Sequence, residues 1–279
     1  MKFRLLPIVL VVAACSGPIG REFGSGAAGV NVADAALRGG SPQVALQVVS
    51  GVLKNDPNNT EALLIEGDAL TLLGRNEAAA KSFEHALSRS PSSDRGLIGL
   101  GRLRLATDPM DAERLFLLVL QKDPTNTTAL NNLGIARDLQ GRHRDAQLAY
   151  RQALGQNPDM TAAQVNLALS LAMDGQGASA ISLIQPLAIA PDASRKVRHD
   201  YAAVLALSGR RAEAEQILSA DLTRAEVAQA LAEYDSVAQG GRTPPQMPPA
   251  KPRVMPFQGS SREPLPSQPI VTVAQGAAP

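Results

Sequence analysis

Five prolines recur along the chain at intervals of 33 or 34 residues, namely Pro57, Pro91, Pro124, Pro158 and Pro191. A proline cannot continue an α-helix, and it biases the residue before it away from helical backbone angles. A period of this length therefore indicates an array of helical repeats, in which each proline separates one repeat from the next. One such repeat has no closed core, whereas a stack of several does.

The residues within one period are those that two packed helices require. Between Pro124 and Pro158 the chain reads Leu130-x-x-Leu133-Gly134, then Gly141, then Ala146-x-x-x-Tyr150-x-x-Ala153. We expect the small residues Gly134 and Ala146 where the two helices approach each other, with the Tyr150 ring as the filler. This pattern matches the tetratricopeptide repeat (TPR), a hairpin of two helices.

The other periods carry the same marks with variations. Residues at equivalent points precede Pro91, namely Gly67, Gly74, Ala79, Phe83 and Ala86. The turn before Pro124 carries Asp108-Pro109 in place of glycine and is one residue longer. Pro186 falls inside the second helix of the fifth repeat, where we expect a kink or an early end.

The fold predicted from these marks is all-α, a right-handed TPR solenoid of about six hairpins with disordered ends. We expect it to span residues 30–238. The residues Thr223-Arg224-Ala225-Glu226 have the spacing of a capping box, which predicts a further helix that covers the end of the solenoid.

The first residues have the features of a secretory signal. Lys2 and Arg4 precede the apolar run 5–14, which is too short to span a bilayer. The run ends in Val12-Ala13-Ala14-Cys15, which resembles the lipobox of bacterial lipoproteins, in which the cysteine becomes the first mature residue and carries acyl chains. Cys15 is the only cysteine, so it has no intramolecular disulfide partner. We expect a signal peptide over residues 1–14 and lipidation at Cys15; the alternative is an ordinary signal peptide with an unrelated cysteine.

The residues after Cys15 suggest where the mature chain is held. Ser16 follows the cysteine in place of aspartate, and by resemblance to lipoprotein sorting rules this favours the periplasmic face of the outer membrane. Residues 15–29 are rich in glycine and small residues, which predicts a flexible tether. The stretch 24–29 spells G-x-G-x-x-G, but that motif binds a dinucleotide only between a strand and a helix, so we expect no cofactor.

The opposite end is rich in proline. Residues 240–279 contain ten of the twenty prolines of the chain, a composition that does not support a packed core. We therefore expect residues 239–279 to form a Pro-rich disordered tail. It serves as a solubilising segment, or else contacts a partner through Met255-Pro256-Phe257.

Composition and motifs exclude several classes of function. The formal net charge is +1, there is no tryptophan and only 3% of the residues are aromatic, which argues against a nucleic-acid binder. The three histidines, which we interpret as residues of helix surfaces and turns, lie in different repeats without metal-ligand spacing: His85, His143 and His199. No catalytic motif occurs. We expect no enzyme, metal or small-molecule substrate; an envelope enzyme that uses the repeats as a substrate platform is the less favoured alternative.

One polar series suggests a binding surface. Asn132, Asn166 and Asp200 are 34 residues apart and fall at the same point of the first helix in three successive repeats. An asparagine offers both a donor and an acceptor, so this ladder is predicted to hold the backbone of an extended peptide. Neighbouring side chains that supply apolar contact are Ile135, Leu169 and Met173. The alternative is that asparagine is common at this point of TPR sequences and binds nothing.

A narrower resemblance joins these features. The stretch Asn131-Asn132-Leu133-Gly134-Ile135-Ala136-Arg137-Asp138-Leu139-Gln140-Gly141-Arg142-His143 is similar to the central repeat of the TadD-type lipoproteins of the Flp/Tad (tight adherence) pilus assembly system. Residues 197–209 and 220–226 resemble the last repeat and closing helix of that family. The resemblance covers the lipobox and residues 40–238 but not the tail, and Asp200-Tyr201 departs from the asparagine that the family often has there.

The resemblance implies an outer-membrane lipoprotein without catalytic or metal-binding residues. It would act as a pilotin, a scaffold that binds a secretin subunit while the pilus or secretion system assembles. The alternative within the same class is a general TPR lipoprotein scaffold for outer-membrane β-barrel assembly or envelope maintenance.

Overall fold

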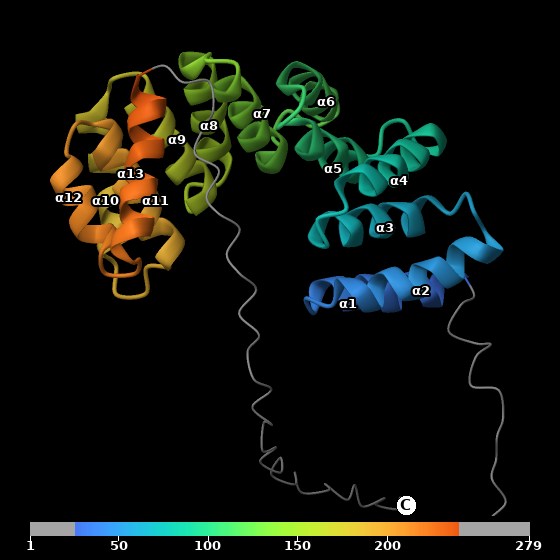
Figure 1. Ribbon diagram of the computed structural model, residues 1–279. Coiled ribbons are helices and arrows are strands. Elements are labelled where there is room, and N and C mark those ends of the chain that lie inside the picture. Colours follow the sequence, from blue (N-terminus) through green and yellow to red (C-terminus); the bar gives the residue numbers. More distant parts are fainter. Residues whose placement is uncertain (1–25, 240–279) are drawn as a thin grey trace, which may run out of the picture. The chain divides into compact units, whose positions relative to one another are not determined.

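The computed structural model describes residues 26–239, which form thirteen α-helices and no β-strand (Figure 1). The helices are α1 (Gly26–Arg38), α2 (Pro42–Asn55), α3 (Thr60–Leu72), α4 (Asn76–Arg89), α5 (Asp94–Arg104), α6 (Pro109–Lys122), α7 (Thr127–Leu139), α8 (His143–Gln156), α9 (Thr161–Met173), α10 (Gly177–Ile189), α11 (Arg195–Leu207), α12 (Arg211–Leu218) and α13 (Arg224–Ala238). The signal peptide, Cys15 and the Pro-rich segment from residue 240 lie outside the described residues. None of the thirteen helices is long and apolar enough to cross a membrane.

The helices pair into six hairpins followed by α13, as the proline period predicts. Each odd-numbered helix from α1 to α11 packs against the even-numbered helix after it and against the next odd-numbered helix. The main contacts of the even-numbered helices are with the odd-numbered helices before and after them. The odd-numbered helices therefore form the more closely packed inner layer of the solenoid (Figure 1).

Glycines close most of the turns within the hairpins. The turn residues with a left-handed backbone are Gly40, Gly74, Gly141, Gly175 and Gly209, with φ between 70° and 80°. Glycine adopts this conformation without the steric cost of a Cβ atom. The turn from α5 to α6 has no glycine; four residues separate these helices where three separate α3 from α4, and Asp108 accepts a hydrogen bond from the Asp111 backbone N–H as the N-cap of α6. The longer turn predicted at Asp108-Pro109 is confirmed.

In the hairpins α3–α4 and α7–α8, an aromatic ring of the second helix packs directly against a glycine of the first helix. A Cβ atom added to Gly134 would lie 2.4 Å from the Tyr150 ring, and one added to Gly67 would lie 2.6 Å from the Phe83 ring. Both rings are at most 1% exposed. Each glycine thus leaves room for the aromatic ring on the second helix of the same hairpin. The small residue Gly134 and the filler Tyr150 predicted from the spacing are in direct contact.

Two boundaries differ from those expected. Helix α1 begins at Gly26, so residues 26–29 are helical where we expected a tether; Gly29 and Val30 are buried, and this burial stabilises the first turns. Helix α10 continues through Pro186 to Ile189 and does not end early. The exposed ring of Pro186 removes a single backbone hydrogen bond, while Ile184 and Ala188 on either side are buried and hold the helix in place.

The last helix covers the end of the stack. Thr223 and Glu226 form the predicted capping box at its start. Val227, Leu231 and Tyr234 of α13 are buried in one hydrophobic cluster with residues of α11 and α12. The described solenoid therefore ends in a helix that buries the apolar side of the sixth hairpin.

Candidate functional site

The six residues predicted to bind a peptide all lie on the inner layer. Asn132 and Ile135 belong to α7, Asn166, Leu169 and Met173 to α9, and Asp200 to α11. Helix α7 packs against α9, and α9 against α11, so the structure brings the three helices together. The side chains differ in which hydrogen-bonding groups or apolar surfaces remain available to a ligand.

The two asparagines do not hydrogen-bond to each other. Asn166 donates from Nδ2 to Oδ1 of Asn131, the residue before Asn132, over 3.0 Å. Asn132 is 3% exposed, and its Nδ2 has no hydrogen-bond partner among the described residues. A buried amide donor without an acceptor costs about 1–3 kcal/mol, so this side chain would gain from an acceptor supplied from outside the folded chain.

The third member of the series is occupied. Asp200 is buried and accepts a hydrogen bond from Lys196 Nζ, one turn earlier in α11, over 2.8 Å. Tyr234 of α13 lies close enough that the charge on Asp200 adds to the effect of burial, and together they raise the pKa of Tyr234 to about 12. Helix α13 therefore lies beside this end of the inner layer, and Lys196 presents the accessible charge there.

The apolar members are only partly available. Ile135 and Leu169 are half-buried and pack against the hydrophobic cluster of the C-terminal hairpins. Met173, near the end of α9, is also half-buried. The inner layer thus offers the exposed parts of these side chains rather than a deep apolar pocket.

A buried polar cluster fixes the register of α7, α8 and α9. Asp138 accepts hydrogen bonds from His143 Nδ1 over 2.8 Å, from Tyr150 Oη over 2.9 Å and from Ser170 Oγ over 2.7 Å. Burial raises the pKa of Asp138 in spite of these donors. Burial also raises the pKa of Tyr150 well above its ordinary value, and the neighbouring carboxylate adds to this. The repeat spacing does not reveal this cluster, although Asp138 and His143 both belong to the stretch 131–143 that resembles the TadD-type repeat.

The N-terminal half of the inner layer is charged. Arg95 of α5 binds Glu61 and Asp68 of α3 over 2.5 and 2.7 Å and lies 3.8 Å from Asp34 of α1. Burial raises the pKa of Asp68, and the Arg95 guanidinium opposes that shift. One cation thus links the first helices of three successive hairpins and leaves an excess of carboxylates on this part of the surface.

The histidines lie apart from one another. His85 is exposed, and His143 is half-buried at the start of α8. His199 is buried, with Nε2 3.3 Å from Asp221 Oδ2 but without hydrogen-bonding geometry, so our interpretation of it as a surface residue was wrong. The sequence did not reveal that the connection between α12 and α13 lies against His199. Within residues 26–239, no group of three or more His, Cys, Asp or Glu side chains is arranged to hold a metal ion.

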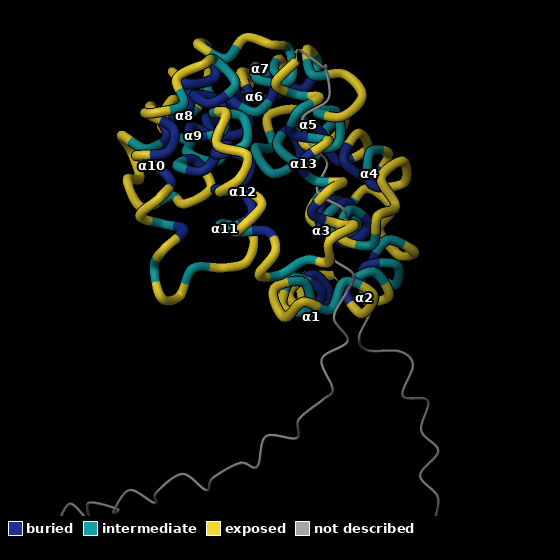
Figure 2. Tube along the Cα trace, turned by 60° about the vertical axis from the view of Figure 1, so that its left-hand side comes forward, coloured by how far each residue is buried: buried dark blue, intermediate teal, exposed yellow. Residues whose placement is uncertain are grey.

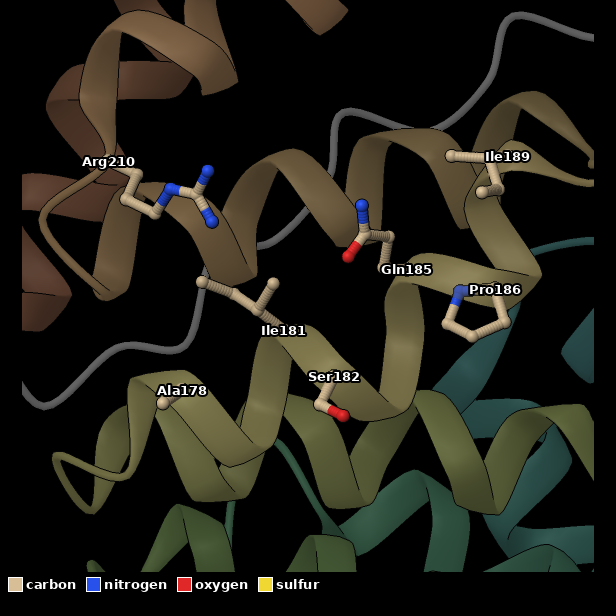
Figure 3. A pocket seen from close by; sticks show the side chains of 7 residues that line it. All are labelled: Ala178, Ile181, Ser182, Gln185, Pro186, Ile189 and Arg210. Atoms are coloured by element: carbon tan, nitrogen blue, oxygen red, sulfur yellow. The ribbon is translucent and has the colours of Figure 1, made fainter.

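A shallow cavity of about 550 Å³ lies elsewhere, along α10 (Figure 3). Its lining is mainly apolar and includes Ile181, Pro186 and Ile189, with Arg210 at one end (Figure 3). The Arg210 guanidinium is held by Glu213 through two hydrogen bonds. No residue of the predicted peptide-binding set lines this cavity.

Comparison with known sequences supports the repeat assignment. A sequence profile of the tetratricopeptide repeat matches residues 32–94 and 133–194. The uncharacterised protein y4yS of Sinorhizobium fredii (strain NBRC 101917 / NGR234) is 35% identical over 101 residues. That alignment covers 36% of this chain and 56% of y4yS, so the chain spans little more than half of the length of this relative.

Solved structures share the fold. PilW, described as a widely conserved type IV pilus biogenesis factor, is 23% identical with a TM-score of 0.64, over 73% of this chain and 96% of PilW. PilF of Pseudomonas aeruginosa is 15% identical with a TM-score of 0.59, over 74% and 96% of the two chains. TTC0263, a TPR protein of Thermus thermophilus, is 20% identical with a TM-score of 0.55, over 63% and 97%. The chain carries TPR repeats and has the fold of a TPR solenoid.

Proposed function

We propose that this chain is a non-enzymatic lipoprotein scaffold on the periplasmic face of the outer membrane, held there by acyl chains on Cys15. Its inner layer binds an extended segment of a protein partner during assembly of a Flp/Tad pilus or secretion system. The partner is a secretin subunit, so the chain acts as a pilotin. The resemblance to TadD-type lipoproteins and the lipobox support the system and the location.

The observation that carries partner binding is the unpaired amide of Asn132. Its buried Nδ2 lacks an acceptor, and a backbone carbonyl of a bound segment supplies one. Binding there requires the side chains that cover Asn132 to move, because this residue is only 3% exposed. Asn166 offers its remaining hydrogen-bonding groups on the adjacent helix.

The fold supports a scaffold of this kind. PilW, with the same fold, is described as a type IV pilus biogenesis factor. At 23% identity that likeness extends to the fold, and the assignment to pilus assembly rests on the sequence resemblance. Lipidation would confine the solenoid near the site where a secretin subunit inserts, which raises its effective concentration for the partner.

Partner capture in intact cells tests the proposal. The lipidated protein is cross-linked, purified from outer membranes and analysed by mass spectrometry. Recovery of a secretin or another pilus component is the expected result. Recovery of β-barrel assembly or cell-wall proteins without any pilus component would replace the pilotin with a general envelope scaffold.

The anchor is tested by Cys15→Ala. We expect loss of pilus assembly while circular dichroism shows that the solenoid remains folded, because Cys15 lies outside residues 26–239, which form the described solenoid. Normal piliation in this variant would contradict an anchored pilotin.

The binding surface is tested with Asn132→Ala combined with Asn166→Ala. We expect partner affinity to fall about tenfold or more, since two polar contacts to the segment are lost. The matched control is Gln121→Ala with Gln152→Ala, two exposed residues of the second helices α6 and α8. Equal affinities of the two double variants would place the contact on another surface.

A further inference from the structure

The two ends of the described solenoid differ in charge. The last helix, α13, carries Arg224, Glu226, Glu233 and Asp235. The first hairpin, residues 26–55, contains only three charged residues, Asp34, Arg38 and Lys54. The next hairpin, residues 60–89, contains eight, five of them acidic. A terminal repeat of a solenoid usually has a polar outer side, and the first hairpin supplies few charges for one.

One flank of the first hairpin has no helix packed on it. Helices α1 and α2 pack against each other and against α3, and no other described helix forms a substantial contact with them. The exposed residues of α1 include Ala28, Asn31, Val32 and Ala35, which follow helical spacing, and α2 exposes Val44. Figure 2 shows exposed residues on both helices. Val32 is 41% exposed and Val44 is 49% exposed.

The charges that remain on this hairpin favour an anionic surface. Asp34, its only acidic residue, is paired with Arg38 over 3.0 Å and lies 3.8 Å from Arg95. The side chain of Arg38 is 76% exposed, and Lys54 is exposed. The hairpin thus carries a net charge of +1, although Arg38 is paired with Asp34. Exposed cations and exposed valines on one hairpin match the headgroups and acyl boundary of an anionic phospholipid bilayer.

The length of chain before α1 keeps this hairpin near such a surface. Ten residues separate Cys15 from Gly26. Whatever their arrangement, a chain of that length spans at most roughly 40 Å. If Cys15 is anchored in the bilayer, α1 is separated from the anchor by fewer residues than any other helix of the solenoid.

We propose that the α1–α2 hairpin is a membrane-contacting face, with Val32 and Val44 at the headgroup boundary and Arg38 and Lys54 on anionic phospholipid headgroups. This inference rests on the anchoring of Cys15 in the proposed function. The hairpin would set the orientation of the inner layer relative to the membrane. A partner segment that emerges from the membrane would then approach the inner layer from a defined side.

The absence of tryptophan and of a second cysteine permits a specific test. The mature chain, beginning at Cys15, is coupled through its thiol to maleimide-bearing lipid in vesicles of phosphatidylethanolamine and phosphatidylglycerol. Val44→Trp then provides a single fluorescent probe on the proposed face. Leu148→Trp is the matched control, because Leu148 is 57% exposed on the second helix α8. Circular dichroism verifies that both variants are folded.

We expect the emission of the Val44→Trp chain to shift to shorter wavelength and to be quenched about twofold or more by brominated acyl chains, since a side chain at the boundary lies ~5–10 Å deep. The Leu148→Trp control should show neither effect. Equal behaviour of the two probes would overturn the membrane-contacting face. A shift that occurs without vesicles and grows with protein concentration would assign the face to a second copy and would also overturn it. Chemical coupling separates this result from the question of whether cells lipidate Cys15, which Cys15→Ala and the cross-linking experiment address.

Discussion

At the residue scale, the close contact of a glycine with an aromatic ring determines how each hairpin closes. Gly134 leaves space for the Tyr150 ring, whose hydroxyl group donates a hydrogen bond to the buried Asp138. The ring cannot move away without breaking that bond. The glycine is required at this point by packing against the ring, since its backbone is an ordinary helical one.

Gly134→Ala should destabilise the protein in spite of the better helix propensity of alanine. The propensity gain is about 1 kcal/mol, and forcing a methyl group against a fixed ring costs about 1–3 kcal/mol. Gly155→Ala is the control, because a Cβ atom there meets nothing within 4 Å and should stabilise α8 by up to about 1 kcal/mol. Chemical denaturation measures both. Equal stability of Gly134→Ala and the wild type would mean that the ring relocates.

A second prediction at this scale concerns Glu113 of α6. Its carboxylate accepts hydrogen bonds from Arg137, Gln140 and Arg142. Burial alone would raise the pKa of Glu113, but these donors outweigh it and hold the pKa below the ordinary value of 4.5. The stabilisation is therefore present above pH 4.5 and is lost as the pH falls through the lowered pKa of the folded state.

Glu113→Gln should lower the free energy of unfolding by about 1–3 kcal/mol at pH 7, with a difference from the wild type that shrinks below pH 4.5. Urea denaturation over a pH series measures this difference. Glu215→Gln, at an exposed carboxylate of α12, should change stability by less than about 0.5 kcal/mol. A difference for Glu113→Gln that stays constant down to acid pH would show that the effect is steric.

At the element scale, the first helices of successive hairpins begin with side-chain N-caps. Asn59, Ser93, Asn126 and Ser194 each accept a hydrogen bond from a backbone N–H three residues later. Met160 stands at this position in α9 and makes no such bond. It instead packs against the small cluster that contains Leu130, so packing replaces a cap at one junction of the array.

Met160→Asn should therefore stabilise the protein by about 0.5–1 kcal/mol, because a typical cap outweighs one partly buried methionine at a surface junction. The reciprocal change, Asn126→Met, should destabilise it by about 1 kcal/mol. Thermal and urea unfolding measure both variants. A gain of stability in Met160→Asn together with a loss in Asn126→Met would support the stabilising role of the N-cap. A loss of stability in Met160→Asn would show that the contact of Met160 with the Leu130 cluster stabilises the protein more than a cap does.

At the scale of the whole molecule, stability is distributed along the stack. Each hairpin packs mainly against its neighbours, and Arg95 of the third hairpin also reaches Asp34 of the first. In an array of this kind, a local defect affects the nearest interfaces most strongly. A buried leucine at the end and one in the middle should therefore have different consequences.

Leu231→Ala in α13 and Leu133→Ala in α7 remove side chains that are 2% and 3% exposed. Each change should cost about 2–5 kcal/mol locally. By hydrogen–deuterium exchange, Leu231→Ala should lower protection in α11 to α13 only, whereas Leu133→Ala should lower it on both sides of α7. Uniform loss of protection over residues 26–239 after Leu231→Ala would mean that the solenoid unfolds as one unit.

The repeat spacing predicted most of the fold because the relevant chemistry is local. The glycine turns at Gly74 and Gly141, the longer turn at Asp108 and the capping box at Thr223 depend on a few consecutive residues. The pairing of Gly134 with Tyr150 was also predictable, since both positions recur with the period. The start of α1 was not, because residues 26–29 are helical only where Gly29 and Val30 become buried.

The sequence by itself determined the number of hairpins, their turns and the helices that carry the candidate binding residues. Only the tertiary structure decided that Asn131 pairs with Asn166, that Asn132 is left without an acceptor and that Asp200 is held by Lys196. The physical reason is that one step along an α-helix turns a side chain by about 100° around the axis. A repeat period places a residue on a helix, but partners on neighbouring helices depend on how those helices are rotated and packed against each other.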